Sequence, residues 1–176
     1  MAVLGADENV VAGLCEKASQ GEVLVAANFN APGQIVVSGA IAACKRIIGI
    51  AETAGFKAIE LKVAGAFHSP LMQPAADRMK NELEKVRIAR PERTVYANVT
   101  AQPHGEPSEI RKLLVEQIVR PVKWEQTMAG LINQPMRFIE LAPGRTLTGL
   151  AKKINRRAPI ESLATADALG AAKESV

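Results

Sequence analysis

The sequence predicts an α/β fold that begins with a ferredoxin-like βαββαβ small lobe over residues 1–63. Three observations support this prediction. Strand and helix patterns alternate in that order, a short turn joins the two central strands, and apolar residues recur at helical spacing in both helices. The chain has 176 residues, 48% of them hydrophobic and 23% charged, which is enough to bury a core in one domain or two small lobes.

The small lobe has clear boundary signals. Asp7 can cap the first helix, which runs to about Ser19. The turn Asn30-Ala31-Pro32-Gly33 separates two β-rich runs by so few residues that we expect them to be antiparallel neighbours. Gly55 ends the second helix. The expected elements are a strand at 2–5, a helix at 7–19, strands at 23–29 and 34–39, a helix at 40–54 and a strand at 57–63.

The pattern changes after Val63, so we expect a lobe boundary near Ala64 and a second lobe over residues 64–165. Its first element is an amphipathic helix. A later helix can be capped by Ser108, and residues 166–176 are expected to form a frayed tail. The expected elements are a helix at 70–86, a strand at 94–99, helices at 108–119 and 122–133, a strand at 136–141, a helix at 145–157 and a strand at 160–165.

His68 is a candidate general base, because it lies where an extended apolar run ends and a charged helix begins. A neutral imidazole can take a proton from a hydroxyl or thiol and return it later. The preceding Ala64-Gly65-Ala66 is small enough to let a substrate or another backbone approach. A surface or capping role is the alternative. The other histidine, His104, lies in the polar loop 100–107, and we expect it to be solvent-exposed without a role.

Two further features each have two interpretations. Gln117 lies beside the apolar stripe of its helix. Its amide is either buried and positions a polar group such as the His68 ring, or it lies at the edge of the stripe and reaches water. Ala142-Pro143-Gly144 precedes the helix at 145–157, where free amides can bind an anion. The alternative is that this turn only connects a strand to a helix.

Composition argues against several classes of protein. A net charge of +4 without a basic stripe among aromatic residues, which make up 3% of the chain, does not indicate nucleic-acid binding. No apolar run approaches membrane-spanning length, and the N-terminus does not resemble a signal peptide. Cys15 and Cys44 have no histidine at metal-ligand spacing, so we expect no metal site. They are typical of reduced core thiols in a cytoplasmic protein.

Four segments of the chain carry a resemblance to a known family. They are NFNAPGQIVVSG at 28–39, GAFHSPLM at 65–72, QIVRPVKW at 117–124 and ELAPGRTLTGL at 140–150. In this order they resemble the C-terminal portion of bacterial malonyl-CoA:acyl carrier protein transacylases, and they are also similar to the acyltransferase domains of polyketide synthases. The resemblance covers nearly the whole chain, and four segments in register are more specific than any single motif.

The resemblance implies an S-malonyltransferase of fatty acid biosynthesis. In this family a serine attacks the malonyl thioester, and the acyl-enzyme passes malonyl from CoA to the phosphopantetheine thiol of acyl carrier protein. His68 matches the base, and Gln117 matches the residue whose main-chain carbonyl orients the imidazole. Phe67 fits a preference for malonyl over methylmalonyl groups, and Asn28 and Asn30 match cleft-lining positions. The CoA thioester and the carrier protein are the implied partners, and no cofactor is implied.

The family's nucleophile motif is missing from this sequence. Its serine lies in a Gly-x-Ser-x-Gly pentapeptide, and no such pentapeptide occurs here. We therefore expect residues 64–165 to be the distal part of an α/β-hydrolase-like acyltransferase lobe, and the chain to be inactive alone. A complementary N-terminal chain is one possible source of the serine.

Two other functions remain open. The chain is either the enzyme's C-terminal portion, a non-catalytic module that keeps a surface for carrier protein or CoA, or an unrelated ferredoxin-like regulatory domain. The order of the four motifs disfavours the last of these.

Overall fold

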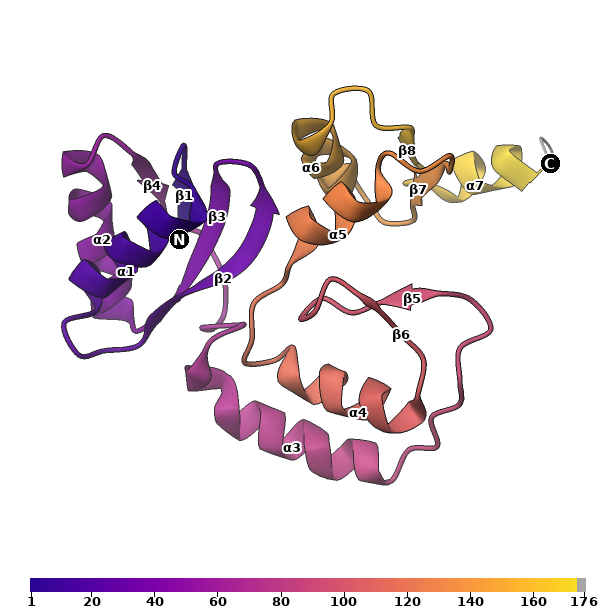
Figure 1. The fold of residues 1–176 in the computed structure, drawn as a ribbon, viewed down its shortest axis with the longest axis horizontal. Helices are drawn as coiled ribbons and strands as arrows, with labels where there is room; N and C mark the ends of the chain where they lie inside the picture. The colour runs from indigo at the N-terminus through magenta and orange to yellow at the C-terminus, as the bar shows by residue number, and fades with distance from the viewer. Residues whose placement is uncertain (174–176) are drawn as a thin grey trace. The chain divides into compact units, whose positions relative to one another are not determined.

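The computed structural model describes residues 1–173 and has an α/β architecture (Figure 1). By its contacts the chain divides into two compact units, Met1–Thr127 and Met128–Val176. This division lies well beyond Ala64, so the lobe boundary expected there remains a prediction.

The first unit begins with a four-stranded sheet in the strand order β2-β3-β1-β4, and every neighbouring pair is antiparallel. Helices α1 and α2 pack against each other and against this sheet (Figure 1). The β-α-β-β-α-β order predicted from the sequence is confirmed. The elements are β1 (Ala2–Leu4), α1 (Glu8–Ser19), β2 (Leu24–Ala31), β3 (Gln34–Gly39), α2 (Ile41–Thr53) and β4 (Lys57–Ile59).

Local signals explain the boundaries of these elements. The Asp7 side chain accepts a hydrogen bond from the Val10 N–H at 2.8 Å, as predicted for the cap of α1. Gly33 adopts φ +67° in the turn between β2 and β3, a conformation that glycine reaches without strain. The fully buried core side chains between the helices and the sheet include Val3, Val11, Val37 and Ile47.

Strand β4 is shorter than the seven-residue run predicted at 57–63. It pairs with β1, whose three residues oppose Lys57, Ala58 and Ile59. Beyond Ile59 the backbone has no strand partner among the described residues, so the chain leaves the sheet and forms the loop that carries His68.

The rest of the first unit contains a pair of packed helices, α3 and α4 (Figure 1). Arg111 of α4 contacts the C-terminal end of α3, where it donates hydrogen bonds to the carbonyls of Leu83 and Val86 at 2.9 Å each. The prediction that Ser108 caps α4 is wrong, because the helix begins one residue earlier, at Pro107. Proline lacks an N–H, but the first N–H groups of a helix have no intrahelical acceptor, so no hydrogen bond is lost. The elements are η1 (Pro70–Met72), α3 (Gln73–Glu84), β5 (Val95–Tyr96), β6 (Pro103–His104), α4 (Pro107–Glu116) and α5 (Trp124–Leu131), the last of which continues into the second unit.

The second unit pairs two short parallel strands, with a helix between them in the chain. Its final helix occupies part of the stretch predicted to be a frayed tail, and residues 174–176 lie outside the described residues. The elements are β7 (Phe138–Glu140), α6 (Thr146–Ile154), β8 (Ile160–Ser162) and α7 (Ala166–Lys173). Within the described part of the chain, no helix is both long enough and apolar enough to span a membrane.

A buried carboxylate occupies the N-terminus of α6. Glu140 is 4% exposed, and its two oxygens accept hydrogen bonds from the Leu147 and Thr148 N–H groups at 2.8 Å each. The anion site proposed for this turn is therefore filled by the chain itself. The Thr148 hydroxyl beside the carboxylate, together with these two N–H groups, holds the pKa of Glu140 below its usual value of 4.5.

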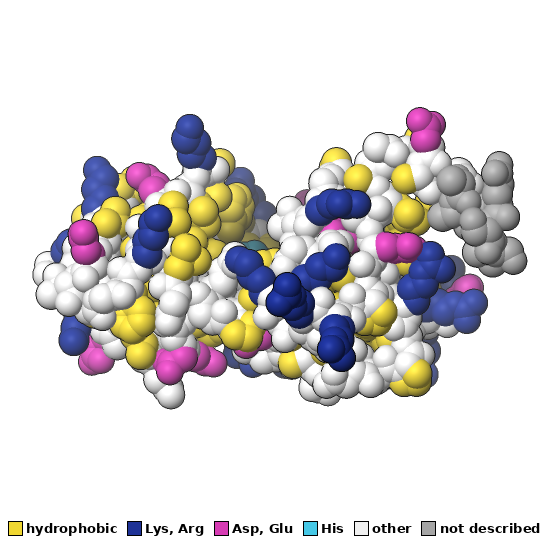
Figure 2. All heavy atoms as spheres, turned by 90° about the horizontal axis from the view of Figure 1, so that it is seen from above, with side chains coloured by type: hydrophobic (Ala, Val, Ile, Leu, Met, Phe, Trp, Pro, Cys, Tyr) yellow, Lys and Arg dark blue, Asp and Glu magenta, His cyan; other side chains and the backbone are white. Residues whose placement is uncertain are grey.

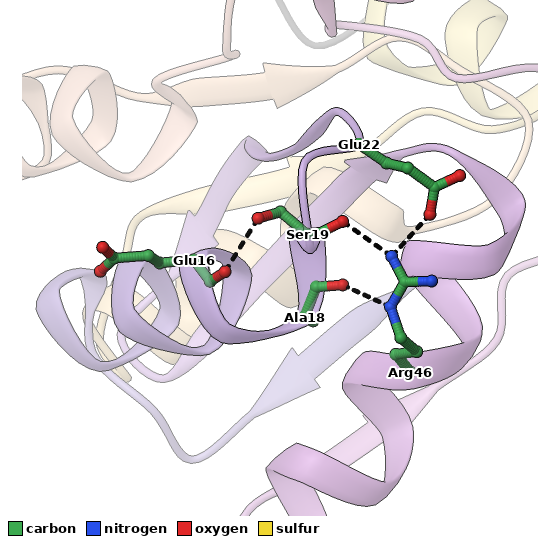
Figure 3. A network of polar contacts seen from close by, with 5 residues as sticks. All are labelled: Glu16, Ala18, Ser19, Glu22 and Arg46. Atoms are coloured by element: carbon green, nitrogen blue, oxygen red, sulfur yellow. Dashed lines mark hydrogen bonds and ion pairs between the residues drawn. The ribbon is translucent and has the colours of Figure 1, made fainter.

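Arg46 of α2 anchors the C-terminal end of α1 (Figure 3). Its Nε donates to the Ala18 carbonyl and its Nη2 to the Ser19 carbonyl, both at 2.7 Å, and Nη2 also pairs with Glu22 at 2.6 Å. These carbonyls lie at a helix end, where no intrahelical partner exists. One guanidinium thus joins both helices and the turn that follows α1.

We expect Arg46→Ala to lower the free energy of unfolding by about 1–2 kcal/mol, because the hydrogen bonds of a charged donor to two carbonyls and to Glu22 are lost at a half-buried site. Chemical denaturation of the variant and its parent measures the difference. Lys45→Ala is the matched control, since Lys45 is an exposed cation on the same helix. Equal destabilisation by both variants would contradict the anchoring role.

We expect Glu140→Gln to destabilise the protein at neutral pH and to flatten the acid dependence of its stability. Because the folded-state pKa is depressed, the Glu140 contribution is present above the unfolded-state pKa and is lost as the pH falls through the folded-state pKa. Thermal unfolding between about pH 3 and pH 7 tests this. Asp167→Asn, which removes an exposed carboxylate of α7, is the control. An unchanged acid dependence in Glu140→Gln would refute the assignment.

Candidate functional site

His68 is held by contacts on both sides of its backbone. Its φ of +58° lies in the left-handed region, which a histidine adopts only where the surroundings impose it. The His68 N–H donates to the Ile118 carbonyl at 3.1 Å. The next residue, Ser69, is fully buried and donates its hydroxyl to the Ala66 carbonyl at 2.6 Å. The loop therefore presents the imidazole from a fixed position.

The His68 ring also has a defined partner. Its Nδ1 lies 2.6 Å from the main-chain carbonyl oxygen of Gln117. A carbonyl can only accept a hydrogen bond, so Nδ1 carries the proton. In the neutral ring Nε2 then has a free lone pair, which is the state that a general base needs.

The end of α4 explains why this carbonyl is available. The last carbonyls of a helix have no intrahelical partner, and Gln117 is the residue at which α4 ends. Two successive carbonyls there, those of Gln117 and Ile118, accept the ring N–H and the main-chain N–H of His68.

The Gln117 side chain has a different partner from the one suggested by the sequence. Its Oε1 accepts a hydrogen bond from Asn98 Nδ2 at 3.1 Å, and the residue is half-buried. The hypothesis that the amide orients the His68 ring is therefore wrong, and the main-chain carbonyl makes that contact instead. Nothing in the sequence pointed to Asn98.

A pocket of about 610 Å³ opens beside His68. Phe67 and Asn28 line it as well, whereas Asn30 does not lie among its lining residues. Much of the rim is apolar and exposed, and Figure 2 shows hydrophobic side chains gathered between Lys and Arg side chains on the surface. The large apolar residues that are exposed and line the pocket are Ile41, Ile48, Leu61, Val63, Phe67 and Leu71.

Asn28 is tied to the same segment that holds His68. It lies in β2 and forms an isolated parallel bridge with Val122. The Phe29 N–H donates to the Val122 carbonyl, and the Val122 N–H donates to the Ala27 carbonyl, both at 2.9 Å. Residues 117–123, which we call the linking segment, thus contact both the His68 loop and the sheet.

Two side chains that could in principle act as nucleophiles are not activated. The Ser69 hydroxyl, next to His68 in the chain, is buried and already donates to a carbonyl. Burial, together with the neighbouring Cys44 thiol, raises the pKa of Cys15 to about 11, so Cys15 is protonated at neutral pH. Among the described residues, no group of His, Cys, Asp and Glu side chains could hold a metal ion.

The prediction that His104 is an exposed loop residue is wrong. His104 pairs with Val95 in the short β5–β6 ladder and is only partly exposed. It lines a second pocket, of about 330 Å³, together with Asn98 and Gln117, and its buried Nδ1 has no hydrogen-bond partner. The sequence missed this because a two-residue strand has no periodicity to detect.

Comparisons with known proteins agree on one family. A family model described as "Acyl transferase domain" matches residues 3–173. A malonyl CoA-acyl carrier protein transacylase of Haemophilus influenzae is 38% identical over 155 residues, which cover 87% of this chain and 50% of that protein. The chain spans about half the length of the curated relatives it matches.

Solved structures give the same result. The malonyl CoA-acyl carrier protein transacylase of Coxiella burnetii matches with a TM-score of 0.91 and 35% identity, over 98% of this chain and 55% of that one. A malonyl-transacylase, solved in complex with its type II PKS acyl-carrier protein, matches with a TM-score of 0.91 and 31% identity, over 99% and 57%. The chain therefore belongs to the acyl transferase domain family.

Proposed function

We propose that this chain carries the histidine base of an S-malonyltransferase, which moves malonyl groups from CoA to the phosphopantetheine thiol of acyl carrier protein in fatty acid biosynthesis. One observation carries the proposal: Nδ1 of His68 donates to the Gln117 carbonyl, so Nε2 is left as an acceptor in a loop that lines an open pocket. Relatives named malonyl CoA-acyl carrier protein transacylase support the choice of substrates.

In the proposed mechanism Nε2 of His68 takes a proton from a serine hydroxyl as that oxygen attacks the malonyl thioester. The imidazolium then gives the proton to the departing CoA sulfur. In the second half-reaction Nε2 takes the proton of the pantetheine thiol, which attacks the acyl-enzyme, and returns it to the serine. In each step the Gln117 carbonyl holds Nδ1–H and stabilises the positive ring.

The serine is the part of this mechanism that the sequence does not contain in the expected motif. We propose that the nucleophile comes from a segment outside the printed sequence, either in the same polypeptide or in a complementary N-terminal chain. The isolated chain would then bind substrates poorly and transfer nothing, because a base without a nucleophile forms no acyl-enzyme.

Phe67 and Asn28 have proposed roles in binding. Phe67 lines the pocket next to His68 and is 49% exposed. A bulky ring beside the acyl group leaves no room for a methyl branch, which favours malonyl over methylmalonyl. Asn28 lines the same pocket and is a proposed cleft residue. Asn30 does not line that pocket, and its proposed place at the cleft rests on the family resemblance alone.

We also propose that residues 1–63 are the ferredoxin-like small lobe of an acyltransferase, and that residues 64–165 are the distal part of its α/β-hydrolase-like large lobe. The β2-β3-β1-β4 order, with both helices packed on the sheet, supports the first assignment. A cytoplasmic location belongs to the same proposal, and the free thiols of Cys15 and Cys44 support it.

The alternative of a non-catalytic module for carrier protein or CoA differs in one testable way. Such a module would need the pocket but not the imidazole, whereas in the structure the Gln117 carbonyl lies within hydrogen-bond distance of the His68 ring itself. Membership of the acyl transferase domain family disfavours an unrelated regulatory domain.

We expect His68→Ala to reduce malonyl transfer to acyl carrier protein by about 10²–10⁴-fold, because the general base is lost. The assay combines the chain with the remaining acyltransferase polypeptide that carries Gly-x-Ser-x-Gly. His104→Gln is the matched control, since it alters the other histidine of the chain. Transfer at the parental rate by His68→Ala would exclude this residue as the base.

We expect Phe67→Ala to raise the ratio of kcat/KM for methylmalonyl-CoA over malonyl-CoA by about 10- to 200-fold, which is the range for one steric contact in an apolar pocket. Competition between the two thioesters in the same reconstituted assay measures this ratio. Ile41→Ala removes another exposed apolar residue of the pocket rim and is the control. An unchanged ratio in Phe67→Ala would show that the ring does not contact the acyl branch.

A further inference from the structure

Asn98 contacts the linking segment at two points. Its side-chain Nδ2 donates to Gln117 Oε1 at 3.1 Å, and its main-chain carbonyl accepts the Lys123 N–H at 2.8 Å. These two residues are the first and last of the segment. Asn98 therefore contacts both ends of the linking segment. This segment supplies the carbonyls of Gln117 and Ile118 that accept hydrogen bonds from His68, and its Val122 pairs with Asn28.

Core packing fixes the position of Asn98 itself. Its neighbours Ala97 and Val99 are buried and form a cluster with Leu113 of α4. Leu113 lies one helical turn before Gln117, and its carbonyl accepts the Gln117 N–H at 3.0 Å. The turn that follows Asn98 is closed by two hydrogen bonds, from Ala97 N–H to the Gln102 carbonyl and from Ala101 N–H to the Ala97 carbonyl.

We propose that Asn98 is a positioning residue for His68: its amide holds the Gln117 side chain, and this keeps the Gln117 carbonyl aimed at Nδ1 of the imidazole. The inference rests on the proposed function of His68 as the base. Asn98 does not touch the ring or the reacting atoms. It acts through the orientation of one peptide group at the end of α4.

The Gln117 peptide needs such support because of where it lies. A carbonyl at a helix end is not fixed by a hydrogen bond inside the helix, and its peptide plane can tilt toward water. A hydrogen bond to the side chain of the same residue restricts that tilt. Asn98 is solvent-exposed, so water competes for its amide and the expected effect is moderate.

The tautomer of the His68 ring is the direct readout. The chain has two histidines, so the ring nitrogens of the ¹⁵N-labelled chain give a simple spectrum. Because His104 lines the same pocket as Asn98 and Gln117, its signals can move too, so the far-ultraviolet circular dichroism spectrum is the reference for an intact fold. In the parent we expect neutral His68 to carry its proton mainly on Nδ1. Asn98→Ala should lower the ratio of the Nδ1–H to the Nε2–H tautomer by about two- to tenfold.

Gln117→Met provides the second test. It keeps the main-chain carbonyl but removes the side-chain oxygen that Asn98 contacts, so it should lower the same ratio to a similar extent. The double variant should be no worse than either single variant, because both remove one interaction. Asn81→Ala, which alters an exposed asparagine of α3, is the matched control and should leave the ratio unchanged.

An unchanged tautomer ratio in Gln117→Met, with an unchanged circular dichroism spectrum, would overturn the proposal, and so would an additive effect in the double variant. If Asn98→Ala fails to fold, Gln117→Met decides the question alone. The readout does not depend on activity. A shifted tautomer ratio combined with full activity of His68→Ala would therefore refute the proposed function and leave the positioning role of Asn98 intact.

Discussion

The hydrogen bond between the His68 ring and the Gln117 carbonyl is the contact on which the chemistry of this site depends. It selects the tautomer that leaves Nε2 free, and it joins a loop after the small sheet to the end of a helix about fifty residues later in the chain. Because the acceptor is a main-chain atom, the contact depends on where α4 ends rather than on which side chain stands at position 117.

The linking segment extends this contact to the rest of the first unit. Its first residues face His68, its Val122 bridges to Asn28 in β2, and Asn98 contacts both of its ends. His68, the proposed base, and a pocket-lining asparagine are thus held by the same seven residues. A small displacement of the segment would move both together.

Helix ends recur as points of attachment throughout the chain. Arg46 donates to the end of α1, Arg111 donates to carbonyls at the end of α3, and Glu140 accepts from the start of α6. In each case a charged side chain from another element contacts backbone groups that lack partners inside the helix. His68 uses the same principle at the end of α4, with an imidazole in place of a guanidinium.

The sequence alone determined the order of the first six elements, the cap at Asp7 and the turn at Gly33, because periodicity, capping and glycine conformation are local properties. It also singled out His68 and Phe67, through the family motif around them. Only the tertiary structure decided the length of β4, the partner of the Gln117 amide, the strand pairing of His104 and the role of Glu140 at α6. Each of these depends on which backbone or side-chain group lies opposite in the folded chain. Residue patterns describe local conformation and do not indicate such partners, so they are known only once the chain is folded.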